Sequence, residues 1–141
     1  MKIGILSDTH NDRQTTQAIL HHFREEKIRT VFHCGDITSP EMINLFNGFT
    51  LHLAFGNADY LTGAIHEKVL LLGTDSSARR KNIFTLNDQK ILILHGNFEN
   101  ELQTDIKSQT YDMIFTGHTH ARENKLIDST SLFNPGAASR S

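Results

Sequence analysis

The chain has 141 residues, a length that fits a single domain, since a typical domain holds ~100–200 residues. Its 14 Lys and Arg nearly balance 16 Asp and Glu, so no basic surplus favours binding to nucleic acid or to an anionic membrane surface. The single cysteine, Cys34, excludes an intramolecular disulfide, and no apolar run approaches the ~18 residues of a membrane span. We therefore expect a cytoplasmic protein with no membrane partner and no specific nucleic-acid partner.

The first half of the chain alternates apolar strands with helices. Strands are expected over residues 2–7, 30–33 and 49–55. A helix is expected over residues 13–27, which Asn11 or Asp12 can cap, and a second from Ser39-Pro40 to about Phe46. This β-α-β-α-β order predicts parallel strands joined by right-handed crossovers.

The second half is richer in hairpins. Further strands are expected over residues 68–72, 83–86, 90–94, 113–115, 124–128 and 131–133. Residues 100–108 are expected to form a helix, and residues 73–81 a polar, mobile loop. Short links at residues 87–89 and 129–130 predict antiparallel hairpins. We therefore predict one α/β domain over residues 1–141, with two sheets packed face to face.

Side chains that can bind metals gather immediately after the apolar strands. They form five short groups: Asp8-Thr9-His10, Gly35-Asp36, Gly56-Asn57, His95-Gly96-Asn97 and Gly117-His118-Thr119-His120. Open α/β sheets bind ligands at the carboxyl ends of their strands, so these groups are predicted to converge on one rim. Four of the 9 histidines, the most unusual feature of the composition, belong to them.

The ligand types favour a catalytic metal centre. Carboxylate, imidazole and amide donors suit Mn, Fe, Zn, Co or Ni, whereas a structural zinc site built on cysteines is excluded by the composition. Six or seven protein ligands are too many for one open catalytic ion. They suit two ions about 3.5–4 Å apart, which is the usual arrangement for hydrolysis of phosphate esters.

The ordered motifs resemble those of the calcineurin-like metallophosphoesterases, specifically their small bacterial and archaeal phosphodiesterase subfamily. The resemblance runs from Asp8 to Asn134-Pro135-Gly136 and implies a four-layer α/β/β/α sandwich of two mixed sheets flanked by helices. It implies two metal sites that share a bridging ligand: Asp8, His10 and His120 at one, Asn57, His95 and His118 at the other, and Asp36 between them. The implied cofactors are two divalent ions, with Mn2+ favoured over Ni2+, Zn2+, Fe2+ and Co2+.

The implied reaction is hydrolysis of a small phosphate ester by in-line attack of a metal-bridging hydroxide, with Asp36, Asn57 and His95 as catalytic residues. Two divalent ions, two carboxylates and a hydroxide would leave the centre at about +1. That local charge would attract phosphate although the whole chain has a net charge of -2.

The sequence departs from the wider superfamily in three places. Ala58 replaces a histidine that protonates the leaving group in many relatives, so esters with good leaving groups are expected to react best. Asn97 replaces the second histidine of a His-Gly-His motif, which weakens any role in proton transfer there. The chain also stops soon after Asn134-Pro135-Gly136, which leaves open an exposed sheet edge that invites a dimer or tetramer, or a truncated terminus.

Several residues and the function itself have a second interpretation. His33 is either a buried core histidine or a partner of the site, and Asp59 either orients Asn57 or caps the following turn. Cys34 is expected to be a small buried filler. The alternative functions are a protein-binding scaffold, as in the similar retromer subunit, and a regulatory metal-binding protein. The presence of all seven candidate ligands favours catalysis.

Overall fold

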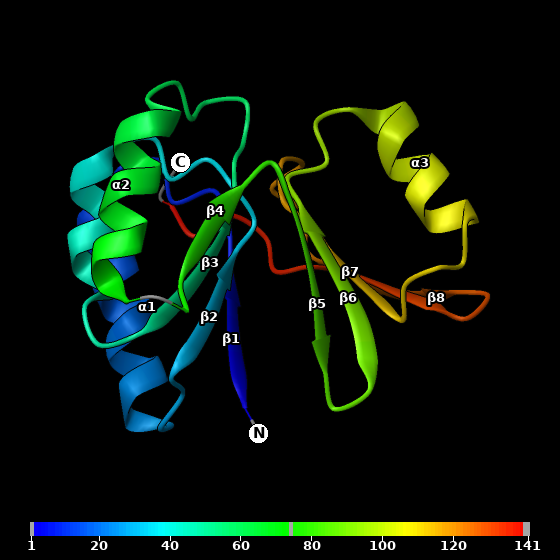
Figure 1. The fold of residues 1–141 in the computed structure, drawn as a ribbon, viewed down its shortest axis with the longest axis horizontal. Coiled ribbons are helices and arrows are strands. Elements are labelled where there is room, and N and C mark those ends of the chain that lie inside the picture. The colour runs from blue at the N-terminus through cyan, green and yellow to red at the C-terminus, as the bar shows by residue number, and fades with distance from the viewer. Residues whose placement is uncertain (1, 74, 140–141) are drawn as a thin grey trace.

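The computed structural model describes residues 2–73 and 75–139, which form two β-sheets packed face to face (Figure 1). The first sheet is parallel, in the order β1 (Ile3–Leu6), β2 (Thr30–His33), β3 (Thr50–Ala54) and β4 (Ser77–Arg79). The second is mixed, in the order β5 (Lys81–Leu86), β6 (Gln89–Leu94), β7 (Met113–Phe115), β9 (Thr130–Asn134) and β8 (Glu123–Ile127). The predicted hairpins are confirmed, because β5 pairs with β6 and β8 with β9 in antiparallel fashion.

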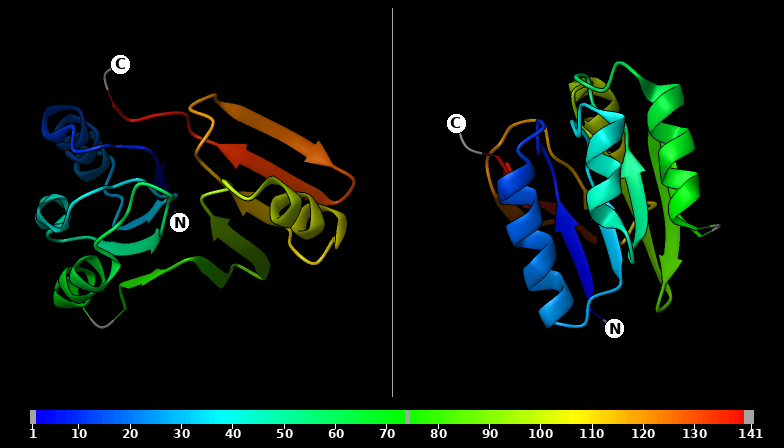
Figure 2. Two further views of the ribbon diagram at one scale, coloured as in Figure 1. Left: turned by 90° about the horizontal axis from the view of Figure 1, so that it is seen from above. Right: turned by 90° about the vertical axis from the view of Figure 1, so that its left-hand side faces the viewer.

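Helices cover the outer faces of both sheets (Figure 2). The first sheet carries α1 (Arg13–Glu25), the 3-10 helix η1 (Pro40–Phe46) and α2 (Thr62–Leu72), and the second carries α3 (Glu99–Lys107). The predicted four-layer α/β/β/α sandwich is therefore confirmed. Within the described ranges, no helix combines the length and the apolar character that crossing a membrane would need.

The core is divided among the three spaces between these layers. Phe32 of β2 and Ile93 of β6 pack together between the two sheets, whereas Val31 packs against the helices on the outer face of the first sheet. On the other side, Leu102 of α3 packs against Leu92 of β6. Neighbouring residues of a strand thus serve opposite faces, which explains why these strands are apolar at successive positions.

Two of the predicted elements are wrong. Residues 68–72 are not a strand but the second half of α2, where Ile65 and Val69 are buried one helical turn apart. Residues 73–81 are not simply a loop, because β4 adds a parallel edge to β3. The Ser76 hydroxyl accepts a hydrogen bond from the Leu51 N–H at 3.0 Å and so secures that edge. The prediction for Thr74 lies outside the described residues.

The start of α1 resolves an alternative that the sequence leaves open. Asp12, and not Asn11, caps the helix, since its Oδ1 accepts a hydrogen bond from the Thr15 N–H at 3.0 Å. Asn11 instead accepts a hydrogen bond from the Ser39 hydroxyl at 2.6 Å. This contact joins the loops that follow β1 and β2 at their carboxyl ends, where the candidate site lies.

Candidate metal centre

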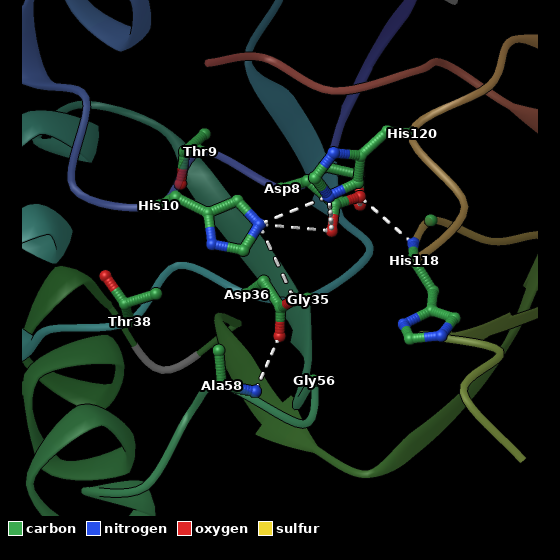
Figure 3. Close-up of polar contacts among 12 residues, drawn as sticks. Asp8, Thr9, His10, Gly35, Asp36, Thr38, Gly56, Ala58, His118 and His120 are labelled. Atoms are coloured by element: carbon green, nitrogen blue, oxygen red, sulfur yellow. Dashed lines mark hydrogen bonds and ion pairs between the residues drawn. The ribbon is translucent and has the colours of Figure 1, made fainter. Parts of the chain in front are cut away.

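All seven predicted ligands lie at one edge of the sandwich, in loops that leave the carboxyl ends of strands from both sheets. Their order along the chain follows the strands: Asp8 and His10 after β1, Asp36 after β2, Asn57 after β3, His95 after β6, and His118 and His120 after β7. Figure 3 shows Asp8, His10, Asp36 and His120, from the loops after β1, β2 and β7, turned toward one another. The candidate ligands thus converge at one edge, as their positions at strand ends predict.

One group of side chains surrounds a carboxylate oxygen of Asp8. His120 Nε2 lies 3.3 Å from Asp8 Oδ1, and His10 Nε2 lies 3.6 Å from the same oxygen. The two imidazole nitrogens are themselves 3.3 Å apart. Two nitrogens and an oxygen that face one point are the arrangement in which a cation satisfies all three atoms at once.

A second group centres on His95, which is almost fully buried. Its Nδ1 lies 2.7 Å from the Cys34 carbonyl oxygen, an acceptor only, so Nδ1 carries the proton and donates. Nε2 therefore presents its lone pair to the site, where it lies 3.2 Å from Asp36 Oδ2 and 3.9 Å from Asp8 Oδ1. Such a fixed tautomer is typical of histidines that bind metals.

Asn57 and His118 lie beside this second group. His118 Nδ1 is 3.2 Å from Asn57 Oδ1, and the rings of His118 and His95 are centred 5.1 Å apart. The His118 backbone N–H also donates to Asp8 Oδ2 at 3.0 Å. Besides Asp36, Asp8 therefore contacts residues of both predicted sites, a shared position that the sequence does not indicate.

The donor atoms fit a bound cation. Asp8 Oδ1 and His95 Nε2 are buried, and neither has a hydrogen-bond partner among residues 2–73 and 75–139. A buried polar atom left in this way costs about 1–3 kcal/mol. Both atoms face the same space, and a carboxylate oxygen beside an imidazole lone pair suits a divalent ion.

The electrostatics of Asp36 and His95 follow from their proximity. Burial opposes ionisation of Asp36, but the adjacent His95 imidazole and the Ala58 N–H outweigh it and hold the pKa of Asp36 at about 2. Burial likewise disfavours the charged form of His95, yet Asp36 and the Cys34 carbonyl raise the pKa of its imidazole. Asp36 and His95 thus each favour the charged form of the other.

The backbone at the centre is strained. Five of the seven candidate ligands have a positive φ: Asp8 (55°), His10 (44°), Asp36 (62°), His118 (68°) and His120 (62°). A positive φ is uncommon outside glycine, although Asp and His adopt it more often than most residues, and such conformations gather at functional sites where the surroundings hold them in place. The sequence gives no sign of this strain, because none of these positions is a glycine.

Two buried polar residues that are not predicted ligands, His33 and Asn134, hold the ligand loops. His33 Nδ1 accepts a hydrogen bond from the Gly35 N–H at 3.1 Å, so its Nε2 carries the proton and donates to the Thr9 hydroxyl at 3.1 Å. Asn134 donates to the Gly117 carbonyl at 2.9 Å, beside His118. Both interpretations of His33 therefore hold, since it is a buried core residue and also supports a ligand loop.

Acid should destabilise the protein through His33. Burial lowers the pKa of its imidazole to about 3, from 6.5 in an exposed histidine. Between these values the unfolded chain binds a proton that the folded protein does not. The free energy of unfolding should then fall as the pH drops from about 6.5 toward 3, by up to about 1.4 kcal/mol per pH unit.

Urea denaturation of the metal-free protein at several pH values between 7 and 4 measures this effect. The variant His33→Gln should show a shallower pH dependence than the wild type, whereas His66→Gln, which changes an exposed histidine of α2, should keep the wild-type slope. Equal slopes for His33→Gln and the wild type would contradict the assignment.

Comparison with known proteins supports this interpretation of the centre. Residues 1–141 match the family model of the calcineurin-like phosphoesterase superfamily domain. The chain is 32% identical over 138 residues to a phosphodiesterase of Methanocaldococcus jannaschii, an alignment that covers 96% of this chain and 83% of that protein. A solved archaeal phosphodiesterase matches with a TM-score of 0.92 and 32% identity, over 97% of this chain and 84% of the other.

The fold is also shared with more distant proteins. The zinc complex of Vps29 from Entamoeba histolytica superimposes with a TM-score of 0.75 and 21% identity, over 100% of this chain and 78% of that one. At this level of identity the comparison establishes the common sandwich alone.

Proposed function

The chain belongs to the calcineurin-like phosphoesterase superfamily and is accordingly a metal-dependent phosphoester hydrolase, and from this premise we propose that it is a binuclear phosphodiesterase. The observation that supports the proposal most is the pair of buried atoms Asp8 Oδ1 and His95 Nε2, which lie 3.9 Å apart and make no hydrogen bond within the described part of the chain. Without a cation, the burial of these two atoms would cost free energy of folding.

We assign the ligands by their position in the two groups. Asp8, His10 and His120 would hold one ion, and Asn57, His95 and His118 the other. Asp36 would bridge them, because its Oδ2 lies 3.6 Å from His10 Nε2 and 3.2 Å from His95 Nε2. Mn2+ is the favoured metal, and Ni2+, Zn2+, Fe2+ and Co2+ can also bind a mixed set of carboxylate, amide and imidazole donors.

The chemistry divides between the ions and the chain. When bound, two divalent ions would polarise the phosphoryl oxygens and lower the pKa of a water molecule to about 7, which makes a nucleophile available for in-line attack. Asn57 is exposed, so its amide N–H groups can donate to a phosphoryl oxygen as negative charge develops there. His95 keeps its Nε2 lone pair directed into the centre through the bond of Nδ1 to Cys34.

Metal analysis and a hydrolysis assay test the proposal. The protein treated with a chelator should lose hydrolysis of bis(p-nitrophenyl) phosphate and recover it with Mn2+. Mn2+ at about 100 times its Kd should also raise the free energy of unfolding by about 2.7 kcal/mol. Bound metal with no turnover of any phosphate ester would favour the alternatives, a protein-binding scaffold or a regulatory metal-binding protein.

The lack of a side-chain acid at Ala58 should make the rate depend on the leaving group. A positioned general acid contributes about 10²–10⁴-fold. We therefore expect p-nitrophenyl esters to be cleaved at least about 100-fold faster than matched alkyl diesters. The variant Ala58→His, which offers an acid, should narrow this ratio, and equal rates for aryl and alkyl leaving groups in the wild type would argue for another acid.

The expected partner is a small phosphate ester. Self-association into a dimer or tetramer through a sheet edge stays a prediction, as does the organisation of residues 1–141 as a single domain. Size-exclusion chromatography with light scattering would decide the first.

A further inference from the structure

Asp59 is a buried carboxylate that lies next to the centre and is not one of its ligands. The residue is 5% exposed, and both of its carboxylate oxygens accept hydrogen bonds from backbone N–H groups. Oδ2 accepts from Gly56 at 2.7 Å and from Asp36 at 2.9 Å, and Oδ1 accepts from Thr38 at 2.7 Å. Converging N–H groups of this kind form an anion-binding concavity, which here is filled by a side chain of the protein itself.

The backbone that Asp59 holds is strained. Asp36 and Thr38 have φ angles of 62° and 76°, and a positive φ is a genuine outlier for a β-branched residue such as threonine. The Thr38 hydroxyl is also buried without a hydrogen-bond partner in the described part of the chain. A conformation of this kind persists only where the surroundings hold it, and the bonds to Asp59 provide that restraint.

The loop after β3 holds Asp36 a second time, at its side chain. The Ala58 N–H donates to Asp36 Oδ1 at 2.8 Å, a contact drawn in Figure 3. With its N–H bound by Asp59 and one carboxylate oxygen bound by Ala58, Asp36 can direct only Oδ2 toward His10 and His95. The direction of the proposed bridging carboxylate thus depends on the loop after β3.

We propose that Asp59 is a positioning residue that fixes the Asp36 carboxylate and thereby sets the affinity of the centre for metal, an inference that rests on the proposed function. A local turn cap would need only the bond to Gly56, since the Asp59 N–H also closes that turn onto the Gly56 carbonyl at 3.1 Å. The bonds to Asp36 and Thr38 instead cross to the loop of another strand.

The variant Asp59→Asn tests the proposal with almost no change in shape. The amide retains one oxygen but places an NH2 donor against a backbone N–H, so the bonds to Asp36, Thr38 and Gly56 cannot all be kept. In the metal-free protein, amide hydrogen exchange at Asp36 and Thr38 should become faster. Affinity for Mn2+ measured by calorimetry should fall about 10–100-fold. At saturating Mn2+ the KM should stay within about 2-fold of the wild type.

Asp112→Asn is the matched control. Asp112 is exposed, and its Oδ2 accepts a single backbone hydrogen bond, from the Lys90 N–H at 2.7 Å, at the start of β7. The control should leave Mn2+ affinity unchanged. Thr38→Gly added to Asp59→Asn keeps the test valid if the single variant folds poorly, because glycine tolerates the positive φ. The double variant should regain thermal stability but not Mn2+ affinity.

Mn2+ affinity within about 2-fold of the wild type in a folded Asp59→Asn protein would overturn the proposal, even if Tm fell. Recovery of affinity together with stability in the double variant would overturn it too. Failure of the wild type to bind Mn2+ would instead refute the proposed function. The exchange rates of the metal-free proteins would still report whether Asp59 holds Asp36 and Thr38.

Discussion

Replacement of Asp36 by asparagine should reduce hydrolysis of bis(p-nitrophenyl) phosphate by at least about 100-fold. Loss of a residue that merely supports a ligand already costs about 10–100-fold, and Asp36 Oδ2 faces both His10 and His95 directly. The amide oxygen that Asp36→Asn introduces can still accept the Ala58 N–H, so the loop should keep its shape. Metal content after dialysis against Mn2+, measured by atomic absorption, should fall with the rate.

A surface substitution of the same chemistry provides the control for Asp36→Asn. Asp88 is exposed in the turn between β5 and β6, and Asp88→Asn should keep both metal content and rate. The Tm of the metal-free Asp36→Asn protein should fall modestly near neutral pH, because contacts with His95 and the Ala58 N–H outweigh burial and make the ionised carboxylate favourable in the fold. Normal metal content and normal rate in Asp36→Asn would disprove the bridging assignment.

Gly56→Ala should reduce the rate of hydrolysis nearly as much as Asp36→Asn, although it adds only one methyl group. A Cβ at Gly56 would lie 2.6 Å from the Asp36 nitrogen and 3.0 Å from Asp36 Cγ. These atoms are held by Asp59 and Ala58, so they cannot move without turning the carboxylate. A displacement of about 1 Å at a catalytic site can cost about 10²-fold, and we expect a loss of rate of that order. Overpacking should also destabilise the fold by about 1–3 kcal/mol.

Gly63→Ala is the corresponding control. Gly63 lies near the start of α2, and apart from its own chain neighbours and helix backbone, no described atom lies within 4 Å of the position where its Cβ would be. Alanine there should leave the rate unchanged and stabilise the helix by up to about 1 kcal/mol. Thermal denaturation and steady-state kinetics of both variants give the comparison. A Gly56→Ala protein with wild-type kcat and metal content would refute the close approach described for this loop.

The sequence predicts the convergence of the candidate ligands better than it predicts some of the fold around them. Ligand groups lie at the carboxyl ends of strands, and the two packed sheets place these ends at the same edge, so His10 and His120 meet across 110 positions of the chain. The same reasoning failed for residues 68–72, because a short apolar run has no period that separates a strand from the end of a helix. Only the position of Ile65, one turn before Val69, makes the helix evident.

The restraints on the ligands could not be predicted for a different reason. His33, Asp59 and Asn134 each hold at least one backbone group of a ligand loop, and the sequence does not show where a backbone N–H or carbonyl points. The same holds for the positive φ of Asp8 and Asp36, which tertiary contacts impose on residues that ordinarily avoid it.

Because the proposed ligands come from two sheets, tight binding of metal would require both sheets to have folded and packed. Four of the candidate ligands follow strands of the sheet that is synthesised first, namely Asp8, His10, Asp36 and Asn57, whereas His95, His118 and His120 follow strands of the second sheet. Neither half alone has a complete donor set at either position. High affinity for metal should therefore appear only once the two sheets have packed together. A bound ion would then oppose their separation.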